Sequence, residues 1–477
     1  MSDVVRDENP VIDKANLPLS REAHWEDVIR RQKAVAANAA TRRERGRSAL
    51  LRLRRMITEN ESRFLTALRE DLGKPATESL TSEIAVTLNE IDLLLRKQRR
   101  FLRDRRIRTG PGNLARVSKR PYGSVLILSP WNYPLQLALL PLAGALIAGN
   151  GCFLKPSELS PATSGLIAEL AREFFREEEL VIVEGDAEVS SALLRQDWDF
   201  IFFTGSERVG ALVAARAAEL RIPSILELGG KCPCIVDAKS VTAVTARRIV
   251  WGKFFNAGQT CITADHVWVE ESAREPLVEE MKKQIDALYG NDPEKSRDYG
   301  RIIHDRHFAR LTAMLANGRV AHGGRNRPGT RYLEPTIMVD PDPESPLMKE
   351  EIFGPILPIL TWFDRDDLLR KLAVRPEPLA AYVFCEDEAL WQELVDELRC
   401  GAICRNTVMG HAGKAQLPFG GVGASGYGRY HGVASFDAFT WEKVVYRTPR
   451  FFDPAVKYPP YNEKHLKWIR RLRRFMR

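Results

Sequence analysis

One cysteine lies in a stretch whose composition favours chemistry over packing. Cys261 follows the small, polar run NAGQT within WGKFFNAGQTCIT at residues 251–263. Small neighbours leave room around a thiol, whereas a structural cysteine usually packs among large apolar side chains. An accessible thiol can act as a nucleophile. The alternative is a buried cysteine with no chemical role, because free cysteines are among the most buried residues.

A glutamate with apolar neighbours is the second candidate. Glu227 lies within ILELGGKCPCIVD, between Leu226 and Leu228 and just before Gly229 and Gly230. Burial of an unpaired carboxylate is costly and raises its pKa, which suits a general base. The alternative is an edge strand from which this side chain points to solvent.

Polar residues also mark the ends of three predicted strands. Asn132 follows the strand SVLIL, Lys155 and Glu158 close CFLKPSE, and Gly205 and Ser206 close DFIFFTGS before a helix. Open α/β sheets bind ligands at the carboxyl ends of their strands. A glycine and a serine at a helix start suit a phosphate, because amide N–H groups and the helix dipole both favour an anion. The alternation of strands and helices predicts a parallel, doubly wound domain.

Two motifs that look like ligand sites have simpler explanations. The literal GxGxxG at Gly421, Gly423 and Gly426 neither follows an apolar strand nor opens an amphipathic helix, so we interpret it as a glycine-rich loop. His304 and His307 share a predicted helix face without a third ligand nearby. We therefore expect this pair at the surface, and we expect no metal site.

Composition excludes several classes of protein. The 477 residues exceed what one hydrophobic core usually serves, so we expect two sizeable domains. Seven cysteines fit no disulfide framework in a chain of this length, which favours a reducing compartment and the cytoplasm. The opening MSDVVRDENP lacks the apolar core of a secretory signal. The apolar run LQLALLPLAGALIAG contains Pro141 and is too short to span a membrane.

The net charge of +8 gathers at the C-terminal end of the chain. Residues 462–477 hold seven Lys or Arg and one acid, a net +6, which leaves +2 for the rest. No RNA-binding or zinc-finger signature accompanies the basic helices elsewhere, so we expect solvated faces balanced by acids, and no nucleic-acid partner.

The basic tail itself predicts an amphipathic helix. On such a helix the apolar residues fall on the side opposite the cations: Leu466, Ile469, Leu472, Phe475 and Met476. This pattern is typical of a segment drawn to anionic lipid. The alternatives are a helix docked on the protein's own surface, where it covers the substrate mouth, and a frayed end.

The sequence pattern changes near residue 110 from helical to strand-like. Before it, apolar residues recur at helical spacing, and GPG at residues 110–112 breaks the pattern. The following RVSKRPYGSVLILSP predicts a hairpin arm with Pro121 and Gly123 at its turn, and then a buried strand.

Four motifs together carry a resemblance. The chain contains, in this order, ELGGKCP, FFNAGQTC, EEIFGPILP and LPFGGVGASGYGRYHG. The combination closely resembles the aldehyde dehydrogenase superfamily, and most of all its class 3 branch of fatty- and aromatic-aldehyde enzymes. The similarity extends from about residue 25 to about residue 460.

This resemblance implies an α/β fold with a Rossmann-type cofactor domain, an α/β catalytic domain and an oligomerisation arm. The implied parts are an N-terminal helical part of the cofactor domain (1–106), an arm hairpin (107–123), an NAD(P)-binding core (124–224), a catalytic domain (225–420), a return to the cofactor domain with arm strands (421–461) and the basic tail (462–477). Class 3 relatives also imply a homodimer joined through the arm.

The resemblance further implies the role of each candidate residue. Cys261 matches the nucleophile, the side-chain amide of Asn132 and the main-chain N–H of Cys261 match the oxyanion donors, and Glu227 matches the base that activates water. Six residues match the cofactor contacts: Lys155 and Glu158 at the adenosine ribose, Gly205 and Ser206 at the pyrophosphate, and Glu351 and Phe353 at the nicotinamide ribose. Because a carboxylate at Glu158 suits ribose hydroxyls, we expect NAD, with NADP as an alternative.

The predicted function is NAD(P)-dependent oxidation of an apolar aldehyde, either aliphatic of medium or long chain or aromatic, to its carboxylic acid. The route runs through a thiohemiacetal and a thioester on Cys261. Two alternatives stay open: a dehydrogenase that passes the thioester to coenzyme A, and a non-catalytic binding or structural protein on this fold. We expect a cytoplasmic protein with peripheral contact at the inner face of the membrane through residues 462–477.

Overall fold

The computed structural model describes residues 19–109, 113–451 and 453–473. They form two compact units. The larger is made by the chain up to Phe101 together with Pro121–Thr440, and the smaller by Leu102–Arg120 together with the chain from Trp441. The GPG break and the tail residues Phe475 and Met476 lie outside the described residues.

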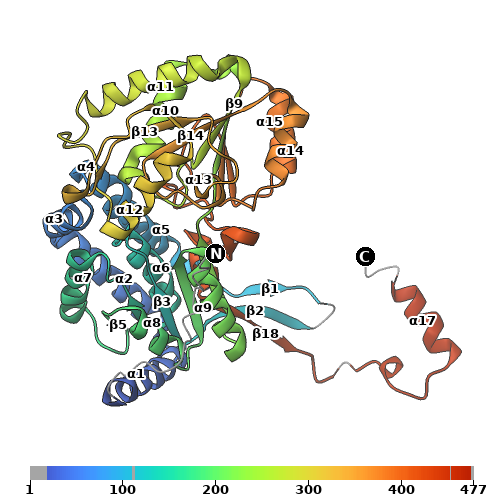
Figure 1. Ribbon diagram of the computed structural model, residues 1–477. Coiled ribbons are helices and arrows are strands. Elements are labelled where there is room, and N and C mark those ends of the chain that lie inside the picture. Colours follow the sequence, from blue (N-terminus) through green and yellow to red (C-terminus); the bar gives the residue numbers. More distant parts are fainter. Residues whose placement is uncertain (1–18, 110–112, 452, 474–477) are drawn as a thin grey trace, which may run out of the picture. The chain divides into compact units, whose positions relative to one another are not determined.

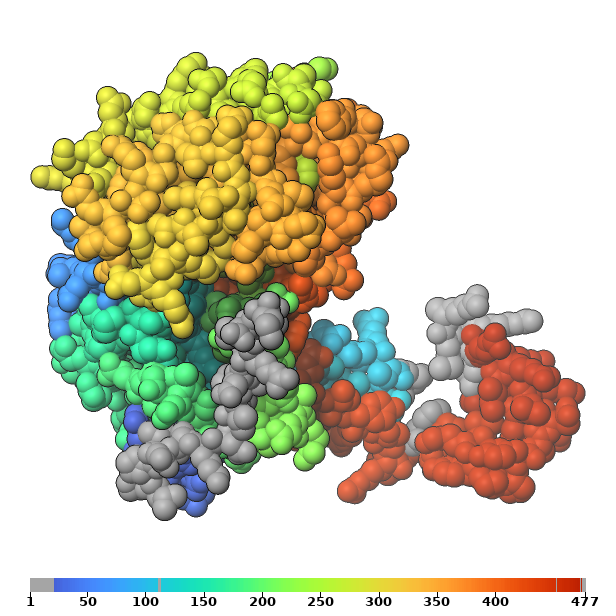
Figure 2. Space-filling view, viewed as in Figure 1, coloured from blue at the N-terminus to red at the C-terminus, as the bar shows by residue number. Residues whose placement is uncertain are grey.

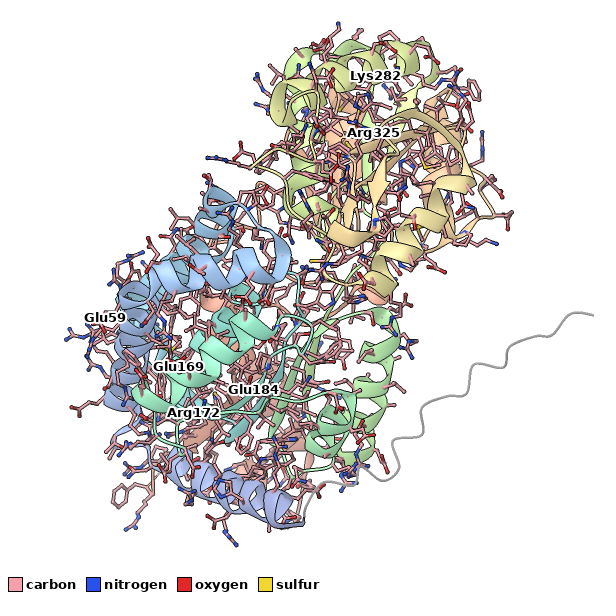
Figure 3. All side chains as sticks on the ribbon, turned by 60° about the vertical axis from the view of Figure 1, so that its left-hand side comes forward. Glu59, Glu169, Arg172, Glu184, Lys282 and Arg325 are labelled. Carbon is pink, nitrogen blue, oxygen red and sulfur yellow. The ribbon has the colours of Figure 1, made fainter. Side chains whose placement is uncertain are left out.

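The larger unit begins with helices, as the spacing of apolar residues predicts (Figure 1). They are α1 (Leu19–Ala37), α2 (Arg42–Glu59), α3 (Glu61–Leu72), α4 (Ala76–Ser79), a π-helical turn η1 (Leu80–Ile84) and α5 (Ala85–Phe101). Basic residues of α2 pair with acids, Arg54 with Asp92 at 3.0 Å and Arg55 with Glu59 at 2.9 Å. Figure 3 shows Glu59 pointing outward from this part. These helices therefore balance their own charge at a solvated face.

A six-stranded sheet forms the first core of the larger unit. Its strands are β3 (Ser124–Leu128), β4 (Gly151–Lys155), β5 (Leu180–Ile182), β6 (Phe200–Gly205), β7 (Ser224–Leu228) and β17 (Gly426–Tyr427). The order is β17-β7-β6-β3-β4-β5, with every pair parallel except β17 with β7. The connecting helices are α6 (Gln136–Ala148), α7 (Pro161–Phe174), α8 (Ala187–Leu194) and α9 (Glu207–Leu220).

This topology confirms the prediction of a Rossmann-type fold. β3 and β6 are neighbours although β4 and β5 lie between them in sequence, so the winding reverses at this pair. Ligands of doubly wound sheets bind at that point, beyond the carboxyl ends of the strands. Asn132 follows β3 and Gly205 ends β6, which places both at this edge of the sheet.

A seven-stranded sheet forms the second core of the larger unit. Its order is β10-β13-β14-β9-β8-β15-β16, parallel except for β10. The strands are β8 (Pro233–Val236), β9 (His266–Glu270), β10 (Arg319–His322), β13 (Thr336–Val339), β14 (Ile356–Trp362), β15 (Ala380–Phe384) and β16 (Ala402–Arg405). A separate pair is formed by β11 (Asn326–Arg327) and β12 (Tyr332–Leu333).

Helices cover both faces of the seven-stranded sheet. Val267 and Val269 of β9 pack in the core formed with α10 (Ala243–Phe254) and α11 (Arg274–Tyr289), whereas Trp268 packs with α14 (Arg365–Ala373) and α15 (Glu388–Glu397). This alternation follows from the two-residue period of a strand. Figure 2 shows a continuous surface of yellow and orange side chains over this part of the chain. The remaining helices are α12 (Asp305–Met314), α13 (Pro346–Lys349) and α16 (Val433–Ala438).

The smaller unit contains a three-stranded sheet and a helix. The sheet has the order β1-β2-β18, with β1 (Arg105–Ile107), β2 (Leu114–Pro121) and β18 (Thr440–Arg447), and α17 (Glu463–Arg473) follows. The hairpin is formed by β1 and β2, so the predicted turn at Pro121 and Gly123 is wrong. β2 runs to Pro121, and Gly123, at φ 146°, belongs to the link toward β3.

None of the described helices is both long and apolar enough to cross a membrane.

Candidate active site

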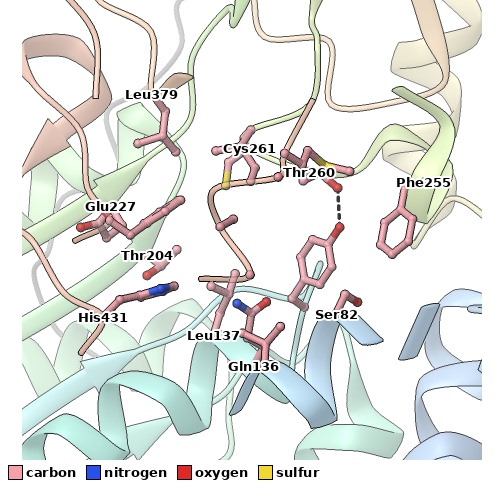
Figure 4. Close-up of a pocket in the computed structure, with 18 of the residues that line it drawn as sticks. Ser82, Gln136, Leu137, Thr204, Glu227, Phe255, Thr260, Cys261, Leu379 and His431 are labelled. Atoms are coloured by element: carbon pink, nitrogen blue, oxygen red, sulfur yellow. Dashed lines mark hydrogen bonds between the residues drawn. The ribbon is translucent and has the colours of Figure 1, made fainter. Parts of the chain in front are cut away.

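A cavity of about 270 Å³ lies in the larger unit, and the candidate nucleophile lines it. Figure 4 shows the side chains around it. Most of its wall is apolar, with contributions from Leu137, Trp251, Phe255, Leu379, Met409 and Phe419. Polar groups reach it at Cys261, Glu227, Thr204 and His431. The thiol and the carboxylate that the sequence singled out thus share one pocket.

A strained turn delivers Cys261 to this cavity. After α10 ends, Asn256 and Ala257 adopt left-handed backbone conformations, with φ of 53° and 51°, which cost non-glycine residues roughly 1–2 kcal/mol each. Their hydrogen bonds hold the turn: Glu78 Oε2 accepts from the Asn256 N–H at 2.9 Å, and Asn256 Nδ2 donates to the Gln259 carbonyl at 3.2 Å. Such outliers persist only where the surroundings determine them, and they concentrate at functional sites.

The environment keeps the Cys261 thiol protonated in this state. Burial raises the pKa of the thiol, and the carboxylates of Glu351 and Glu227 raise it further. The N–H groups of Cys261 and Ile262 act in the opposite direction and weaken this effect. A nucleophilic thiolate therefore forms here only when a base accepts the proton.

Asn132 lies against the turn that carries Cys261. Its side-chain Nδ2 donates to the main-chain carbonyl of Gln259 at 3.1 Å. The main-chain carbonyl of Asn132 accepts from Asn256 Nδ2 at 2.9 Å. The side chain is buried. The structure thus brings the end of β3 and the Cys261 turn together.

Glu227 is buried on β7, so the alternative of a solvent-facing edge strand is wrong. β7 lies between β6 and β17, and Glu227 is 2% exposed. Both carboxylate oxygens lack a hydrogen-bond partner among the described residues. Burial raises its pKa well above the usual range, although the charge of Arg429 opposes this effect. A carboxylate with a raised pKa is a stronger base than an ordinary glutamate, which suits the abstraction of a proton.

The four residues assigned to the adenosine and pyrophosphate lie at the carboxyl ends of β4 and β6. Lys155 ends β4, and its Nζ contacts Glu158 Oε2 at 2.6 Å. Glu158 is partly exposed, which leaves its carboxylate accessible to a ribose. Gly205 ends β6, and Ser206 caps α9 by accepting from the Val209 N–H at 3.5 Å. A glycine beside the free N–H groups of a helix start fits a pyrophosphate.

Glu351 and Phe353 lie on the segment before β14. The Glu351 carboxylate lies so close to Gly229 that a Cβ there would stand 2.1 Å from Oε2. Burial raises the pKa of Glu351 to about 8. Phe353 has φ 55°, and its carbonyl accepts from His307 Nε2 at 2.8 Å. Trp131 packs edge-on against the Phe353 ring, with centroids 5.3 Å apart.

The prediction that His304 and His307 both lie at the surface is wrong. His307 is buried and holds the Phe353 carbonyl, and burial lowers its pKa to about 3, so it is a neutral donor. His304 precedes α12 as its N-cap and accepts from the His307 N–H at 3.0 Å. Within the described residues, no group of three or more His, Cys, Asp or Glu could hold a metal ion.

A buried ion pair that sequence reasoning missed supports Asn132. Lys74 and Glu83 are both fully buried and meet at 2.5 Å. Lys74 Nζ also donates to the Asn132 carbonyl at 3.3 Å, and Glu83 Oε2 accepts from the Leu135 N–H at 2.9 Å at the start of α6. The pair therefore fixes the loop from Asn132 to α6. Nothing in the local sequence around Lys74 marks its contact with Asn132, because that carbonyl lies 58 residues later in the chain.

The chain is similar to known proteins along most of its length. The family model described as the aldehyde dehydrogenase family matches residues 8–445. The 4,4'-diapolycopene-4,4'-dial dehydrogenase of Cytobacillus firmus is 44% identical over 403 residues, which cover 84% of this chain and 89% of that protein. The human aldehyde dehydrogenase family 3 member B1 is 40% identical, over 93% of this chain and 96% of that protein.

Solved structures agree with these relatives. The substrate-bound AldH of Staphylococcus aureus superimposes with a TM-score of 0.90 at 38% identity, over 94% of this chain and 99% of that one. The AldA indole-3-acetaldehyde dehydrogenase of P. syringae in complex with NAD⁺ gives a TM-score of 0.82 at 26% identity, over 90% of this chain and 89% of that one. These likenesses confirm the α/β fold predicted from the sequence.

Proposed function

Since this chain belongs to the aldehyde dehydrogenase family, we propose that it oxidises an apolar aldehyde to the carboxylic acid, with NAD as the hydride acceptor and NADP as an alternative. The observation that carries this proposal is one apolar cavity lined by both the Cys261 thiol and the Glu227 carboxylate. The substrate is an aliphatic aldehyde of medium or long chain, or an aromatic aldehyde.

The first chemical step is the addition of the Cys261 sulfur, as the thiolate, to the aldehyde carbon, and the thiol proton passes to solvent, so that Glu227 is free to act as the base afterwards. Addition makes that carbon tetrahedral and places negative charge on its oxygen. The amide of Asn132 and the N–H of Cys261 stabilise this charge. An amide nitrogen carries two N–H groups, so Asn132 can bind Gln259 and the oxyanion at once. A bound nicotinamide would supply the hydride acceptor, and the Cys261 sulfur would keep the acyl group as a thioester.

The second step is hydrolysis of the thioester. The Glu227 carboxylate takes a proton from water, whose oxygen attacks the thioester carbon. The C–S bond then breaks and the acid leaves. Support comes from the position of Glu227 in the same cavity as Cys261, and from a raised pKa that suits a base.

The six assigned residues supply the cofactor site. Lys155 and Glu158 contact the adenosine ribose, Gly205 and Ser206 the pyrophosphate, and Glu351 and Phe353 the nicotinamide ribose. The N-terminus of α9 and the partly exposed Glu158 support this assignment. The NAD⁺ complex of the P. syringae relative favours NAD.

The apolar wall supports the substrate class. Side chains such as Leu137, Trp251 and Met409 offer hydrophobic contact and few hydrogen bonds. One relative is named a 4,4'-diapolycopene-4,4'-dial dehydrogenase, which also supports an aldehyde substrate.

The decisive experiment measures NADH formation against aldehydes from short aliphatic to long-chain and aromatic. Turnover that rises with chain length or with an aromatic ring, and is lost in Cys261→Ala, is the expected result. Glu227→Gln should give a burst of NADH and then stall at the thioester. Unimpaired steady turnover in Glu227→Gln would contradict its role.

The same assay separates the alternatives. An enzyme that transfers its acyl group to coenzyme A needs that thiol for turnover, whereas hydrolysis does not. A coenzyme A route needs no base to activate water, so the presence of Glu227 in the same cavity as Cys261 supports hydrolysis instead. A non-catalytic protein would form no NADH with either cofactor.

The chain forms a homodimer through its smaller unit in this proposal. β18 ends the order β1-β2-β18 and carries the exposed apolar residues Val444 and Tyr446. An unpaired edge with apolar side chains is a ready surface for a second copy. Light scattering after size exclusion should give twice the chain mass, and Val444→Lys with Tyr446→Lys should give the monomer mass.

The basic tail contacts anionic membrane in this proposal. In α17, Leu466, Trp468 and Ile469 are each nearly half exposed, next to the cations of the same helix. Apolar area and positive charge together favour an anionic lipid surface. Deletion of residues 462–477 should abolish co-sedimentation with phosphatidylserine vesicles but leave oxidation of a soluble aldehyde intact. Unchanged co-sedimentation would refute the idea and favour docking on the protein's own surface.

A further inference from the structure

Three buried side chains face the cavity without hydrogen-bond partners. Among the described residues, Thr204 Oγ1, both carboxylate oxygens of Glu227 and His431 Nε2 have none. Thr204 is 9% exposed, Glu227 2% and His431 3%. Figure 4 shows the three labelled side chains grouped on one side of the pocket, away from Phe255 and Ser82. Buried polar atoms without partners are costly, so such a group indicates a bound polar ligand.

The fold places these side chains together by strand pairing. Thr204 of β6 and Glu227 of β7 are partners in register, so their side chains leave the same face of the sheet side by side. β17 pairs with β7 on its other edge, with Gly426 opposite Glu227, and the chain continues from β17 to His431. Three segments thus converge on one small polar site.

His431 is held there against backbone strain. Its φ is 75°, in the left-handed region that only glycine adopts freely. The His431 N–H donates to Ser435 Oγ at 2.8 Å, Ser435 Oγ donates to Glu90 Oε1 at 2.9 Å, and the Gly432 N–H donates to the same oxygen at 2.6 Å. A fully buried carboxylate on α5 therefore fixes the conformation that aims His431 at the cavity. Strain maintained in this way is typical of functional residues.

The imidazole is neutral and its plane is fixed. Burial lowers the pKa of His431 to about 3, so the ring carries no charge at working pH. It stacks on Phe419 at 5.3 Å and lies edge-on to Tyr430 at 4.5 Å. A neutral imidazole offers Nε2 as a donor or as an acceptor, according to its tautomer. It can therefore orient a water molecule without competing for the proton.

We propose that Thr204 and His431 hold, together with Glu227, the water that hydrolyses the thioester. This inference rests on the proposed function. A buried water needs two to four polar partners, and the three side chains supply them. The water oxygen forms a bond to the thioester carbon, one water proton passes to the Glu227 carboxylate, and the C–S bond breaks with its electron pair on the Cys261 sulfur. The sulfur then takes up that proton, so the products are the acid and the free thiol.

In this arrangement His431 and Thr204 are positioning residues and Glu227 is the base. The two positioning residues act on hydrolysis and not on the addition of sulfur or the loss of hydride. Loss of either positioning residue should slow the second step alone.

The test separates the two steps by rapid mixing with an aldehyde and NAD. His431→Phe keeps the ring that stacks on Phe419 and removes both nitrogens, and Thr204→Val keeps the shape on a rigid strand and removes the hydroxyl. In each variant we expect an NADH burst of one per active site at the wild-type rate, followed by steady turnover at least about 10-fold slower, because a misplaced reactant costs one to two orders of magnitude. His431→Gln should recover part of the steady rate.

Two further measurements exclude a general structural effect. Hydroxylamine attacks a thioester without a positioned water, so it should restore turnover in His431→Phe and release the hydroxamic acid. His411→Phe is the matched control, because His411 also stacks on Phe419, at 6.0 Å, but does not line the cavity. It should leave the ratio of burst to steady rate unchanged.

Three results would overturn the inference. Equal loss of burst and steady rates in both variants would place the residues before the thioester. A raised KM with an unchanged steady rate would show that the polar site binds a substituent of the substrate. A steady rate equal to wild type in both variants would show that no water is held there. Absence of NADH from the wild type with every aldehyde would instead refute the proposed function itself, and the inference with it.

Discussion

The side-chain amide of Asn132 donates to the main-chain carbonyl of Gln259 at 3.1 Å, two residues before Cys261. This bond joins the loop after β3 to the strained turn after α10, two segments 127 residues apart. It couples the proposed oxyanion donor to the backbone that carries the nucleophile. The spacing between them is thus a property of one hydrogen-bonded unit.

Replacement of Asn132 by alanine should slow the formation of NADH in the burst. Loss of one oxyanion donor costs about 10²–10³ in rate, roughly 3–4 kcal/mol, when its hydrogen bond strengthens in the transition state. Single-turnover mixing at saturating cofactor measures this step, with Asn291→Ala at an exposed position as the control. A burst rate within a factor of two of wild type would contradict the assignment.

Hydrolysis should depend on pH through Glu227. The carboxylate acts as a base only when ionised, and burial raises its pKa well above 4.5. Steady turnover limited by hydrolysis should therefore be low in acid and should rise with pH, with a midpoint above that of an ordinary glutamate. In Glu227→Gln the residual turnover should no longer rise with pH in this range. A midpoint near 4.5 in the wild type would show that the carboxylate is solvated during hydrolysis.

Much of the site was predictable because its signals are local. Asn132, Gly205 and Glu227 each lie at a strand end or beside glycines, where the sequence pattern alone indicates a ligand edge or a buried acid. His307 was misplaced because its burial depends on Trp131 and Phe353, which pack against it from other parts of the chain.

Other residues of the candidate site have no local sequence pattern that would identify them. Lys74 and Glu83 meet within a helical region, and their common target is a loop more than 50 residues later. His431 acquires its role from strand pairing and from Glu90, more than 300 residues earlier. The turn of the arm hairpin was misassigned because Pro121 and Gly123 suit a strand end as well as a turn. Contacts of this kind are set by tertiary packing, which no window of sequence contains.

Removal of one member of the buried pair should destabilise the protein more than removal of both. Lys74→Met leaves Glu83 as an uncompensated buried charge, which costs about 3–5 kcal/mol. The double variant Lys74→Met with Glu83→Gln removes the charge and keeps an acceptor for the N–H groups at the start of α6. Denaturant titration should place the double variant between Lys74→Met and wild type. Additive losses would show that the pair contributes no coupling.

Glu90 should make stability depend on pH in a way that one substitution removes. Burial raises its pKa to about 7 from 4.5, so between these values the folded protein keeps a proton that the unfolded chain releases. The free energy of unfolding from this group is therefore greatest below pH 4.5 and falls as pH rises toward 7, by about 1.4 kcal/mol per unit and about 3 kcal/mol in all.

Glu90→Gln keeps an acceptor for Gly432 and Ser435 and removes the titration. Relative to wild type, the variant should gain about 3 kcal/mol of stability between pH 4.5 and pH 8. Urea titrations at several pH values measure this difference, in which the other titrating groups cancel. Glu59→Gln, at an exposed ion pair with Arg55, controls for the effect of a glutamate-to-glutamine substitution as such. If the free energies of unfolding of wild type and Glu90→Gln changed with pH in parallel, the Glu90 carboxylate would ionise as readily in the folded protein as in water. Glu90, which holds the His431 segment, would then be charged throughout this pH range.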